Sequence, residues 1–447
     1  TVFSQGSRMA ALAYDAAGFL ASVVDPLGRT WGYTYDAVGR VTKEVLPDLR
    51  EVRYTYDGNG NVTSVTPPAR PAHNFSYTPV DLESEYAPPA IVTPSATQYA
   101  YNRDRQMTRV TRPDGQVIDF GYDTGGRLAG VTTARGTLSY TYDTAGRPAS
   151  ATAPATAPAT APESVSFAYD GFLLTSATAT GSAPGVIAYI YDNDFRVTSI
   201  AVGGSPVAFT YDADSLLTGV GGLVLSRNAQ NGFITSAILG STMTSYTYDS
   251  FGDVATMTSP LYSATYARDS LGRITRKSEI VGPQLLTVDY AYDSAGRLAS
   301  GPGGTYTYDA NGNRFPGVYD DQDRLLSFGA NTYAYNANGD LASKSTTTTT
   351  TTTTTFEYDA LGNLVGAVLP TTTRIDYAID GLNRRIGKRV NGTVVQGFLY
   401  ESQLRIAAEL DSTGAVISRF VYATQANVPE LMVKGGVTYR FLHDHLG

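Results

Sequence analysis

A nine-residue pattern, Tyr-x-Tyr-Asp-x-x-Gly-x-apolar, recurs along the chain and constrains its fold more than any other feature. A clear copy runs from Tyr33 to Val41. Tyr33 and Tyr35 are two residues apart, so they share one face of an extended chain. Asp36 can accept hydrogen bonds from backbone N–H groups about two residues further on, and Gly39 can adopt the left-handed conformation of a tight reversal. Each copy therefore predicts the end of one strand, a turn and the start of the next strand.

The pattern is periodic. Tyr14, Tyr35 and Tyr56 follow one another at intervals of 21 residues. Further close copies lie at 54–62, 140–147, 246–254, 290–298, 306–313 and 356–364, and degraded copies at Tyr14-Asp15, Tyr122-Asp123, Tyr169-Asp170, Tyr191-Asp192, Tyr211-Asp212 and Tyr335-Asn336. A fixed period of about 20 residues is the mark of a repeat architecture.

The length of the period predicts an all-β fold. About 20 residues hold two strands and two turns, whereas parallel crossovers need a dozen or more connecting residues, usually a helix. No stretch has a sustained apolar stripe at helical spacing. The 447 residues include 32 Tyr and 45 Gly, which suits strands that end in turns. We therefore expect one continuous antiparallel sheet of consecutive hairpins.

These units resemble the YD repeats of RHS proteins, bacterial toxin-complex shells and animal teneurins. The resemblance covers nearly the whole chain. Towards the C-terminus, the segments Tyr400–Leu410 and Tyr439–Gly447 are similar to the RHS-repeat-associated core. A single Tyr-Asp match is weak, but many copies in register followed by the core motif form a strong signal.

The resemblance implies both a shape and a function. Family members coil the sheet into a spiral, hollow shell that encloses a toxic C-terminal polypeptide, and the core region often releases this passenger by autoproteolysis. The implied function is a non-catalytic shell that encapsulates and delivers a toxin in competition between bacteria or against a host. The implied partners are the chain's own C-terminal passenger and, as further candidates, a secretion-system component or a cell-surface receptor. The implied location is secreted or at the bacterial surface. The alternative is an extracellular adhesion or fibre protein, and a sugar hydrolase is a weaker third hypothesis.

The sequence also predicts a domain organisation. Residues 1–374 form the expected YD-repeat β-shell and 375–447 the start of a truncated core. Three stretches depart from the pattern: 67–98, rich in proline, is expected to be an insertion or long loop; 151–162 an Ala-Thr-Pro loop; and 346–355, with ten threonines, a loop or a protruding hairpin. Because the chain begins within a repeat and ends within the core motif, we expect it to be part of a longer protein.

Composition argues against several classes of function. The formal net charge is −8 without a basic run, which disfavours nucleic-acid binding. No apolar run approaches 18 residues, so we expect no membrane span. The chain has no cysteine and so no disulfides.

The repeated turn residues are candidates for chemistry, but a structural role explains them better. The aspartates could form carboxylate pairs or a Ca²⁺ ladder, yet turn formation accounts for their type, position and number. We expect the residue after the glycine to pair with the aspartate of a neighbouring unit (Arg40, Asn61, Arg147, Arg273 and Arg297). The tyrosines could stack on carbohydrate, but we expect them to pack against one another with exposed hydroxyls.

The remaining candidates are isolated. His443 and His445 could form half of a metal site, but the only other histidine is His73 and the family motif explains the pair. Arg384-Arg385 with Lys388-Arg389 is the densest basic group and is expected to be a solvated strand or turn. Asp25-Pro26 is expected to be a repeat turn rather than a cleavage site. The prediction is therefore no catalytic, cofactor-binding or metal-binding residue, and no cofactor.

Overall fold

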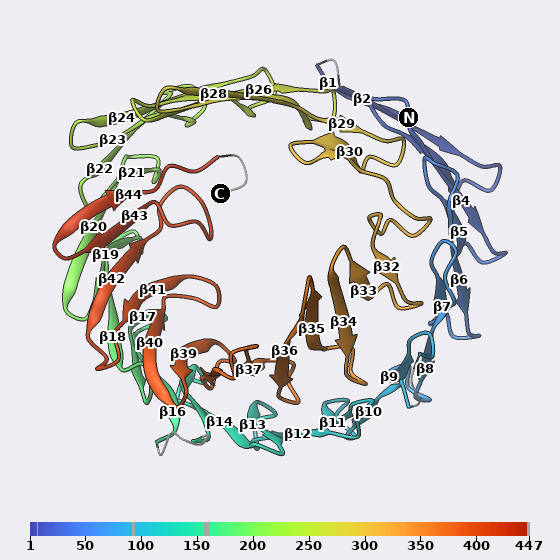
Figure 1. Cartoon of the computed structure of the whole chain (residues 1–447), viewed down its shortest axis with the longest axis horizontal. Coiled ribbons are helices and arrows are strands. Elements are labelled where there is room, and N and C mark those ends of the chain that lie inside the picture. Colours follow the sequence, from blue (N-terminus) through green and yellow to red (C-terminus); the bar gives the residue numbers. More distant parts are fainter. Residues whose placement is uncertain (7, 92–93, 156–160, 445–447) are drawn as a thin grey trace. The chain divides into compact units, whose positions relative to one another are not determined.

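The computed structural model describes residues 1–6, 8–91, 94–155 and 161–444, and throughout this part of the chain the fold is all-β. Strands follow one another as antiparallel hairpins within each of three sheets (Figure 1). The predicted fold class of consecutive antiparallel hairpins is confirmed. Within the described residues no helix is long and apolar enough to cross a membrane.

The first 28 strands form one sheet. Their bounds are β1 Val2–Gln5, β2 Arg8–Tyr14, β3 Leu20–Val24, β4 Thr30–Tyr35, β5 Val41–Val45, β6 Glu51–Tyr56, β7 Val62–Thr66, β8 His73–Tyr77, β9 Glu83–Ala87, β10 Thr97–Tyr101, β11 Met107–Thr111, β12 Val117–Tyr122, β13 Leu128–Thr133, β14 Gly136–Tyr142, β15 Pro148–Ala153, β16 Glu163–Asp170, β17 Leu173–Thr180, β18 Gly185–Tyr191, β19 Val197–Val202, β20 Ser205–Tyr211, β21 Leu217–Val220, β22 Leu223–Arg227, β23 Ile234–Leu239, β24 Thr242–Tyr248, β25 Val254–Thr258, β26 Tyr262–Arg268, β27 Ile274–Val281 and β28 Gln284–Asp289.

The remaining strands form a 3-stranded and a 13-stranded sheet. The small sheet contains β29 Ala291–Tyr292, β30 Leu298–Gly301 and β31 Gly304–Thr305. The larger contains β32 Val318–Tyr319, β33 Leu325–Phe328, β34 Asn331–Tyr335, β35 Leu341–Thr347, β36 Thr351–Tyr358, β37 Leu364–Val368, β38 Arg374–Ile379, β39 Arg385–Val390, β40 Thr393–Tyr400, β41 Ile406–Leu410, β42 Val416–Val421, β43 Leu431–Lys434 and β44 Val437–Arg440.

Each hairpin has an irregularity beside its Tyr-Asp turn. In the β4–β5 pair, Thr34 lies opposite Lys43 but Tyr35 lies opposite Val41, so the register shifts by one residue. The same shift occurs in the β6–β7, β12–β13, β14–β15 and β36–β37 pairs. Such bulges bend a strand and increase its twist. The repeat therefore encodes a recurring bend as well as a turn.

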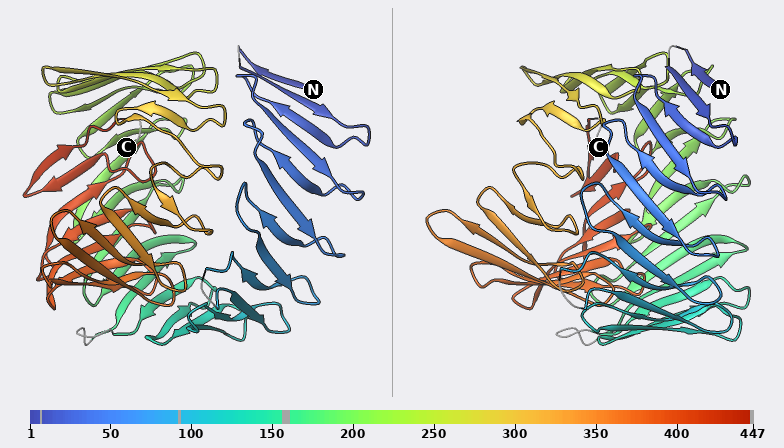
Figure 2. Two further views of the ribbon diagram at one scale, coloured as in Figure 1. Left: turned by 45° about the vertical axis from the view of Figure 1, so that its right-hand side comes forward. Right: turned by 90° about the vertical axis from the view of Figure 1, so that its right-hand side faces the viewer.

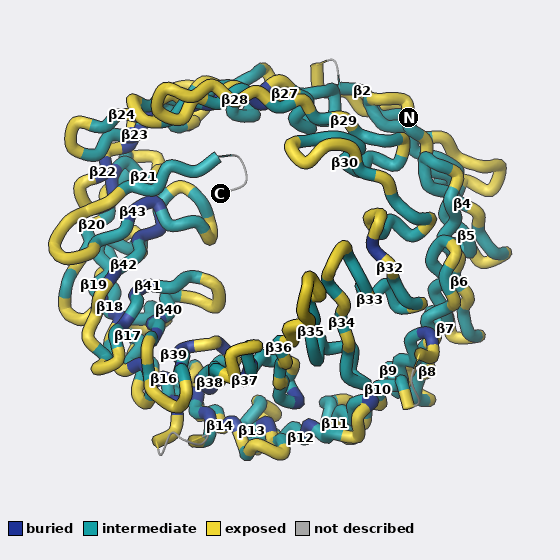
Figure 3. The backbone as a smooth tube through the Cα atoms, viewed as in Figure 1, coloured by how far each residue is buried: buried dark blue, intermediate teal, exposed yellow. Residues whose placement is uncertain are grey.

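The chain divides into two compact units, each made of an early and a late segment. Unit 1 comprises residues 1–115, 246–339 and 345–350, and unit 2 comprises 116–245, 340–344 and 351–447. In unit 2, strands β38–β42 lie against β15–β20 (Figure 2). Buried residues concentrate in unit 2 (Figure 3).

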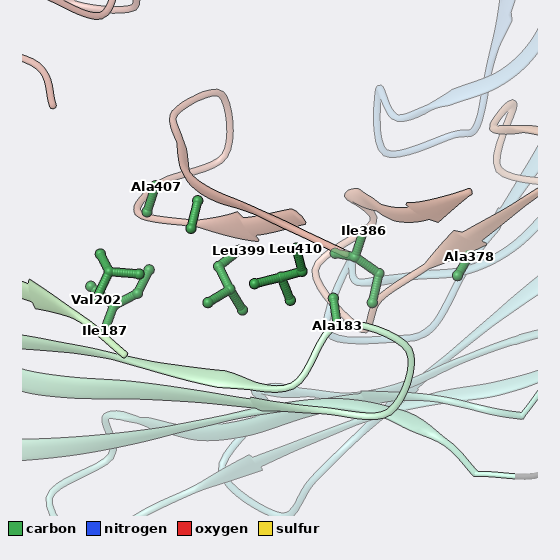
Figure 4. Close-up of a cluster of buried hydrophobic side chains, with 9 residues drawn as sticks. Ala183, Ile187, Val202, Ala378, Ile386, Leu399, Ala407 and Leu410 are labelled. Carbon is green, nitrogen blue, oxygen red and sulfur yellow. The ribbon is translucent and has the colours of Figure 1, made fainter. Parts of the chain in front are cut away.

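The core of unit 2 lies between its two segments. Ile187 and Val202 come from the early segment, and Ile386, Leu399 and Leu410 from the late one; their side chains point into one shared layer (Figure 4). All five are at most 6% exposed. Burial of apolar area of this kind is the main favourable contribution to folding.

The prediction of an insertion or long loop at 67–98 is wrong for most of that stretch. β8 and β9 form a regular hairpin there, and the Tyr77 hydroxyl donates to the Val62 carbonyl as in other repeats. All seven prolines of the stretch fall outside the strands. Since proline interrupts a sheet only where it removes a ladder hydrogen bond, prolines confined to turns leave the repeat intact.

The two low-complexity stretches contain strands. In the threonine run, β35 ends at Thr347 and β36 starts at Thr351, so of the two alternatives expected, a loop or a hairpin, the structure has the hairpin. Threonine's β-branched side chain favours this outcome. In the Ala-Thr-Pro stretch, residues 151–153 belong to β15, and 156–160 lie outside the described residues.

The boundary expected between residues 374 and 375 stays a prediction. β38 begins at Arg374 and pairs with β37 and β39, so the sheet runs through this point.

Candidate functional site

The turn of each repeat has a recurring set of hydrogen bonds around its aspartate. In the Asp36 turn, Asp36 Oδ1 accepts hydrogen bonds from the backbone N–H groups of Val38 and Arg40, both at 3.0 Å. The Gly39 N–H donates to the Asp36 carbonyl, and Gly39 has φ +86°. This is a type I turn followed by a left-handed glycine, a common hairpin connection. The carboxylate has the turn-forming role that the sequence predicts.

The arginine after the glycine joins successive turns, but not as expected. Arg40 Nε donates to its own Asp36 Oδ2 at 2.6 Å, and Arg147 and Arg273 pair with their own aspartates in the same way, so the predicted pairing with a neighbouring unit's carboxylate is wrong for these three. Arg297 bonds its own Asp293, but its Nη2 also lies 3.8 Å from Asp48 of another repeat. The Arg40 guanidinium lies 4.7 Å from the ring centroid of Tyr56 in the next repeat. Arg40 Nη1 also donates to the Asp57 carbonyl at 2.9 Å. The same arrangement over the following tyrosine occurs at Arg127, Arg147, Arg196, Arg273, Arg297, Arg324, Arg384 and Arg405.

In many of the patterns the hydroxyl of the second tyrosine donates a hydrogen bond to a backbone carbonyl of the preceding strand. The Tyr35 hydroxyl donates to the Leu20 carbonyl at 2.7 Å, and the Tyr56 hydroxyl to the Val41 carbonyl at 2.7 Å. The expectation of exposed hydroxyls is therefore wrong for these two tyrosines. The Tyr56 ring packs against the Arg40 guanidinium, and the Tyr35 ring stacks on Phe19 with ring centroids 5.0 Å apart. A ring held between a guanidinium and a backbone carbonyl is not available as a flat sugar-stacking platform.

The environment of the turns shifts pKa values in two directions. The backbone N–H of the turn arginine, together with its side chain, lowers the pKa of the aspartate carboxyl in the turns of Asp36, Asp123, Asp143 and Asp192. Burial raises the pKa of Tyr211 and Tyr292. The carboxylates are therefore held in the charged form and the tyrosines in the neutral form. This pattern stabilises turns and is the opposite of a carboxyl group prepared for acid catalysis.

The described histidines considered as metal ligands each contact another polar side chain. His73 Nδ1 lies 2.8 Å from the Tyr86 hydroxyl, and His443 Nδ1 lies 3.3 Å from Gln425 Nε2. His445 lies outside the described residues. In the described part of the chain, no group of three or more His, Cys, Asp or Glu side chains is placed to hold a metal ion.

The basic group at 384–389 is not a solvated cluster. Arg384 is buried and bonds its own Asp380 through Nε and Nη2, at 2.9 and 2.7 Å. Arg389 is also buried and donates to Ser182 Oγ at 2.8 Å. The expected solvated strand or turn is therefore wrong for these two arginines, because the late segment of unit 2 packs onto the early one. The Asp25-Pro26 turn has the repeat geometry, with Asp25 Oδ1 accepting from the Leu27 N–H at 2.9 Å.

One buried polar group in unit 2 was not anticipated from the sequence. Glu163 accepts from Ser182 twice, from the hydroxyl at 2.5 Å and the backbone N–H at 2.6 Å, and Arg389 completes the set. Glu163 is 2% exposed. The three residues are far apart in sequence and follow no motif, so no local signal could have found them. They join the two segments of unit 2 through Ser182 and Arg389.

Unit 2 also contains a polar cleft of about 420 Å³. Arg374 dominates its lining: the guanidinium bonds both carboxylate oxygens of Glu357, at 2.9 and 2.8 Å, and Asp376 at 2.8 Å. The same arginine therefore bonds both of the carboxylates that line this cleft.

Comparison with known proteins agrees with this structural reading. No curated protein sequence gives a match. Among solved structures, the chain is similar to "TcdB2-TccC3-TEV" (12% identity, TM-score 0.57, 93% of this chain and 30% of that chain) and to the Photorhabdus luminescens Tc holotoxin pore (13%, 0.56, 97% and 28%). It is also similar to "TcdB2-TccC3" (12% identity, TM-score 0.51, 97% of this chain and 33% of that chain). The chain thus spans about a third of the length of these solved chains, and the likeness shows a shared fold.

The family assignment rests on the sequence itself. The profile of the teneurin YD-shell family matches residues 1–447, which is the whole chain. The turn geometry explains the match, because the Tyr, Asp, Gly and Arg positions of the repeat each have a distinct structural role. The chain belongs to the teneurin YD-shell family.

Proposed function

We propose that the chain forms part of the wall of a shell that encloses a polypeptide cargo and delivers it outside the producing cell. The observation that carries the proposal is the spacing of contacts between early and late segments. In unit 1, Arg8 bonds Asp253, 245 residues away, and Ser270 bonds Pro26 at a separation of 244. In unit 2, Arg389 bonds Ser182 at a separation of 207. In each unit, a later segment of the sheet contacts an earlier one after a similar number of residues. A sheet that winds into a wall requires such contacts.

The turn chemistry supports the same role. Arginine and tyrosine contacts join each repeat to the next, so the wall is reinforced along its length rather than at one centre. Closed or stacked sheets also avoid the free edges that promote aggregation. One of the solved structures with this fold is named as a Tc holotoxin pore, which supports a toxin as the cargo and secretion as the route.

The experiment measures whether the chain protects a fused passenger polypeptide from protease. The full chain is produced with a passenger polypeptide fused after Gly447, and the sample is exposed to protease and imaged by electron microscopy. We expect a hollow particle and a passenger that outlasts the same polypeptide free in solution. A passenger cleaved at the free rate with a solid or flat particle contradicts the proposal. Long unbranched assemblies would instead support the surface adhesion or fibre alternative.

A further inference from the structure

The polar cleft of unit 2 lies where the late segment of that unit faces the early one. Its lining comes from β36–β39 of the late segment and from the turn between β13 and β14, which contributes Arg135 (Figure 1). Its volume of about 420 Å³ is within the range of pockets that hold small organic ligands. The polar groups that have no partner within the protein decide what such a cleft can bind.

A row of charged side chains crosses one face of the late sheet. Glu357 of β36 lies opposite Gly366 of β37, which lies opposite Asp376 of β38. Asp376 in turn lies opposite Arg389 of β39. Residues directly opposite one another in antiparallel strands point to the same face of the sheet. The row therefore runs from carboxylate to glycine to carboxylate to arginine.

Arg374 pairs with both carboxylates of this row. It bonds Asp376 of its own strand and reaches over Gly366 to Glu357. A Cβ on Gly366 would lie 2.9 Å from Glu357 Oε2 and 3.1 Å from Arg374 Nη2, so the glycine leaves the room that this ion pair needs. The hydrogen bond from Arg374 also lowers the pKa of Glu357, which keeps the carboxylate charged. Both acidic groups of the cleft thus have a cationic partner.

Arg389 has no carboxylate partner among the described residues. Asp376 is its direct cross-strand neighbour but bonds Arg374. Glu163 accepts from Ser182, and Arg389 reaches only the hydroxyl of that serine, at 2.8 Å. A guanidinium has five N–H donors, and Arg389 lines the cleft although it is only 6% exposed. Burial of a charged group without a counter-charge is unfavourable, and an anion in the cleft would relieve it.

Arg135 provides a second cation from the early segment. Its backbone N–H donates to Thr133 Oγ1 at 3.2 Å within the turn. Its guanidinium is exposed, lines the same cleft and forms no ion pair in the part of the chain that the structure describes. The cleft therefore has two guanidinium groups available, one from each segment, whereas its carboxylates are already bonded. Such a site suits an anion with several acceptor oxygens.

We propose that this cleft binds a phosphate group between Arg135 and Arg389, either free phosphate or the phosphate of a small organic ester. A carboxylate presents two oxygens in one plane, which a single guanidinium can bind by itself. A phosphate presents its oxygens in tetrahedral directions and carries close to two charges at neutral pH, so it can accept from two guanidinium groups that belong to different segments. The site does not depend on the proposed encapsulation, because all of its residues belong to unit 2.

The test is calorimetric titration of the full chain with sodium phosphate and, in separate experiments, with glucose 6-phosphate and citrate, at constant pH and ionic strength. We expect the unmodified chain to bind one phosphate group. Arg135→Gln breaks no ion pair, so the variant should fold, and it should bind phosphate about tenfold more weakly or worse, as expected for the loss of a hydrogen bond to a charged group. Stronger binding of glucose 6-phosphate than of phosphate identifies an ester as the ligand, and equal binding identifies free phosphate.

Arg103→Gln is the matched control, because it removes an exposed arginine from a turn of unit 1 and should leave phosphate binding unchanged. Arg389→Lys keeps the buried charge but not the planar fork, so it should weaken binding as well. The absence of binding of both phosphate compounds by the unmodified chain overturns the proposal. Equal binding by the unmodified chain and Arg135→Gln overturns it too, because the anion would then bind elsewhere. Tighter binding of citrate than of either phosphate compound contradicts the choice of phosphate over carboxylate.

Discussion

Units 1 and 2 are built from the same repeat but are stabilised differently. In unit 1 the early and late segments meet through polar side chains, such as Arg8 with Asp253, Arg50 with the Ala310 carbonyl and Gln322 with the Pro89 carbonyl. In unit 2 they meet through the apolar cluster around Leu399 and Leu410. Of the buried hydrophobic residues in the described chain, only Met257, Ala264 and Tyr266 belong to unit 1.

The difference shows that the repeat and the stacking of segments are separate sources of stability. The turn pattern specifies hairpins in both units, whereas the residues between turns decide whether two segments join by ion pairs or by burial. Partly exposed ion pairs contribute little and are screened by salt, whereas buried apolar side chains contribute more and are not. We therefore expect unit 1 to open more readily than unit 2.

The largest expected effect is from removing a buried side chain of unit 2. Leu410 is 0% exposed, and Leu410→Ala should lower the free energy of unfolding by about 2–5 kcal/mol, because it removes apolar contacts and leaves a cavity. The control is Leu285→Ala in unit 1, where the side chain is 65% exposed and the change should stay within about 0.5 kcal/mol. Denaturant melts measure both, and equal effects would contradict the comparison.

The turns of unit 1 should provide the next largest effect. Gly39 and Gly18 both have positive φ, but a Cβ on Gly39 would lie 2.7 Å from the Phe19 ring, whereas a Cβ on Gly18 would contact nothing within 4 Å. Gly18→Ala should cost about 1 kcal/mol from backbone strain alone, and Gly39→Ala about 2 kcal/mol or more. Thermal melting of the two variants measures the difference. If they were equally stable, the Phe19 contact would have no energetic consequence.

A smaller effect should follow from removing one polar link in unit 1. Arg70→Gln breaks the contacts with Asp309 and Asp323 and should cost about 1–2 kcal/mol, reduced by solvent screening. Raising the salt concentration from about 0.1 to 1 M should speed hydrogen exchange in unit 1 and leave β40 and β41 of unit 2 unchanged. Salt sensitivity confined to unit 2 would reverse the comparison.

The smallest loss of stability per residue should come from protonating the turn aspartates at low pH. The turn aspartates have pKa values below that of an unfolded aspartate, about 3.9, so they bind fewer protons in the folded chain. Their contribution to stability is fully present above that pH and is lost as the pH falls through the lowered folded pKa values. Hydrogen exchange at pH 3 should show unit 1 opening before unit 2, since the apolar core of unit 2 does not titrate. Simultaneous opening would indicate that the turns dominate both units.

The sequence allowed much of the fold to be predicted. The Tyr-Asp-Gly period identified the strands and turns, and the structure confirms the turn role of Asp36 and Gly39. The error lay where composition obscured the pattern. Prolines at 67–98 suggested an insertion although Tyr77 maintained the register. Threonines at 346–355 left a loop and a hairpin equally open, and the structure has the hairpin.

The chemistry of the turns was less predictable. The partner of Arg40 could not be chosen from sequence, because its own Asp36 and the aspartate of the next repeat are both within reach of a long side chain. For Asn61 the predicted contact with a neighbouring unit is present, to Asp81. The shorter side chain lies at the boundary between two turns and can contact both.

The sequence by itself determined the local structure of each repeat: where strands end, where the backbone takes a left-handed conformation and where each repeat bends. These features depend on residues within about ten positions of one another. Only the tertiary structure decided which segments meet and how, as with Glu163, Ser182 and Arg389, or Arg70 with Asp309. The physical reason is that contacts more than 200 residues apart depend on the summed bend and twist of many hairpins, and no single repeat specifies that sum.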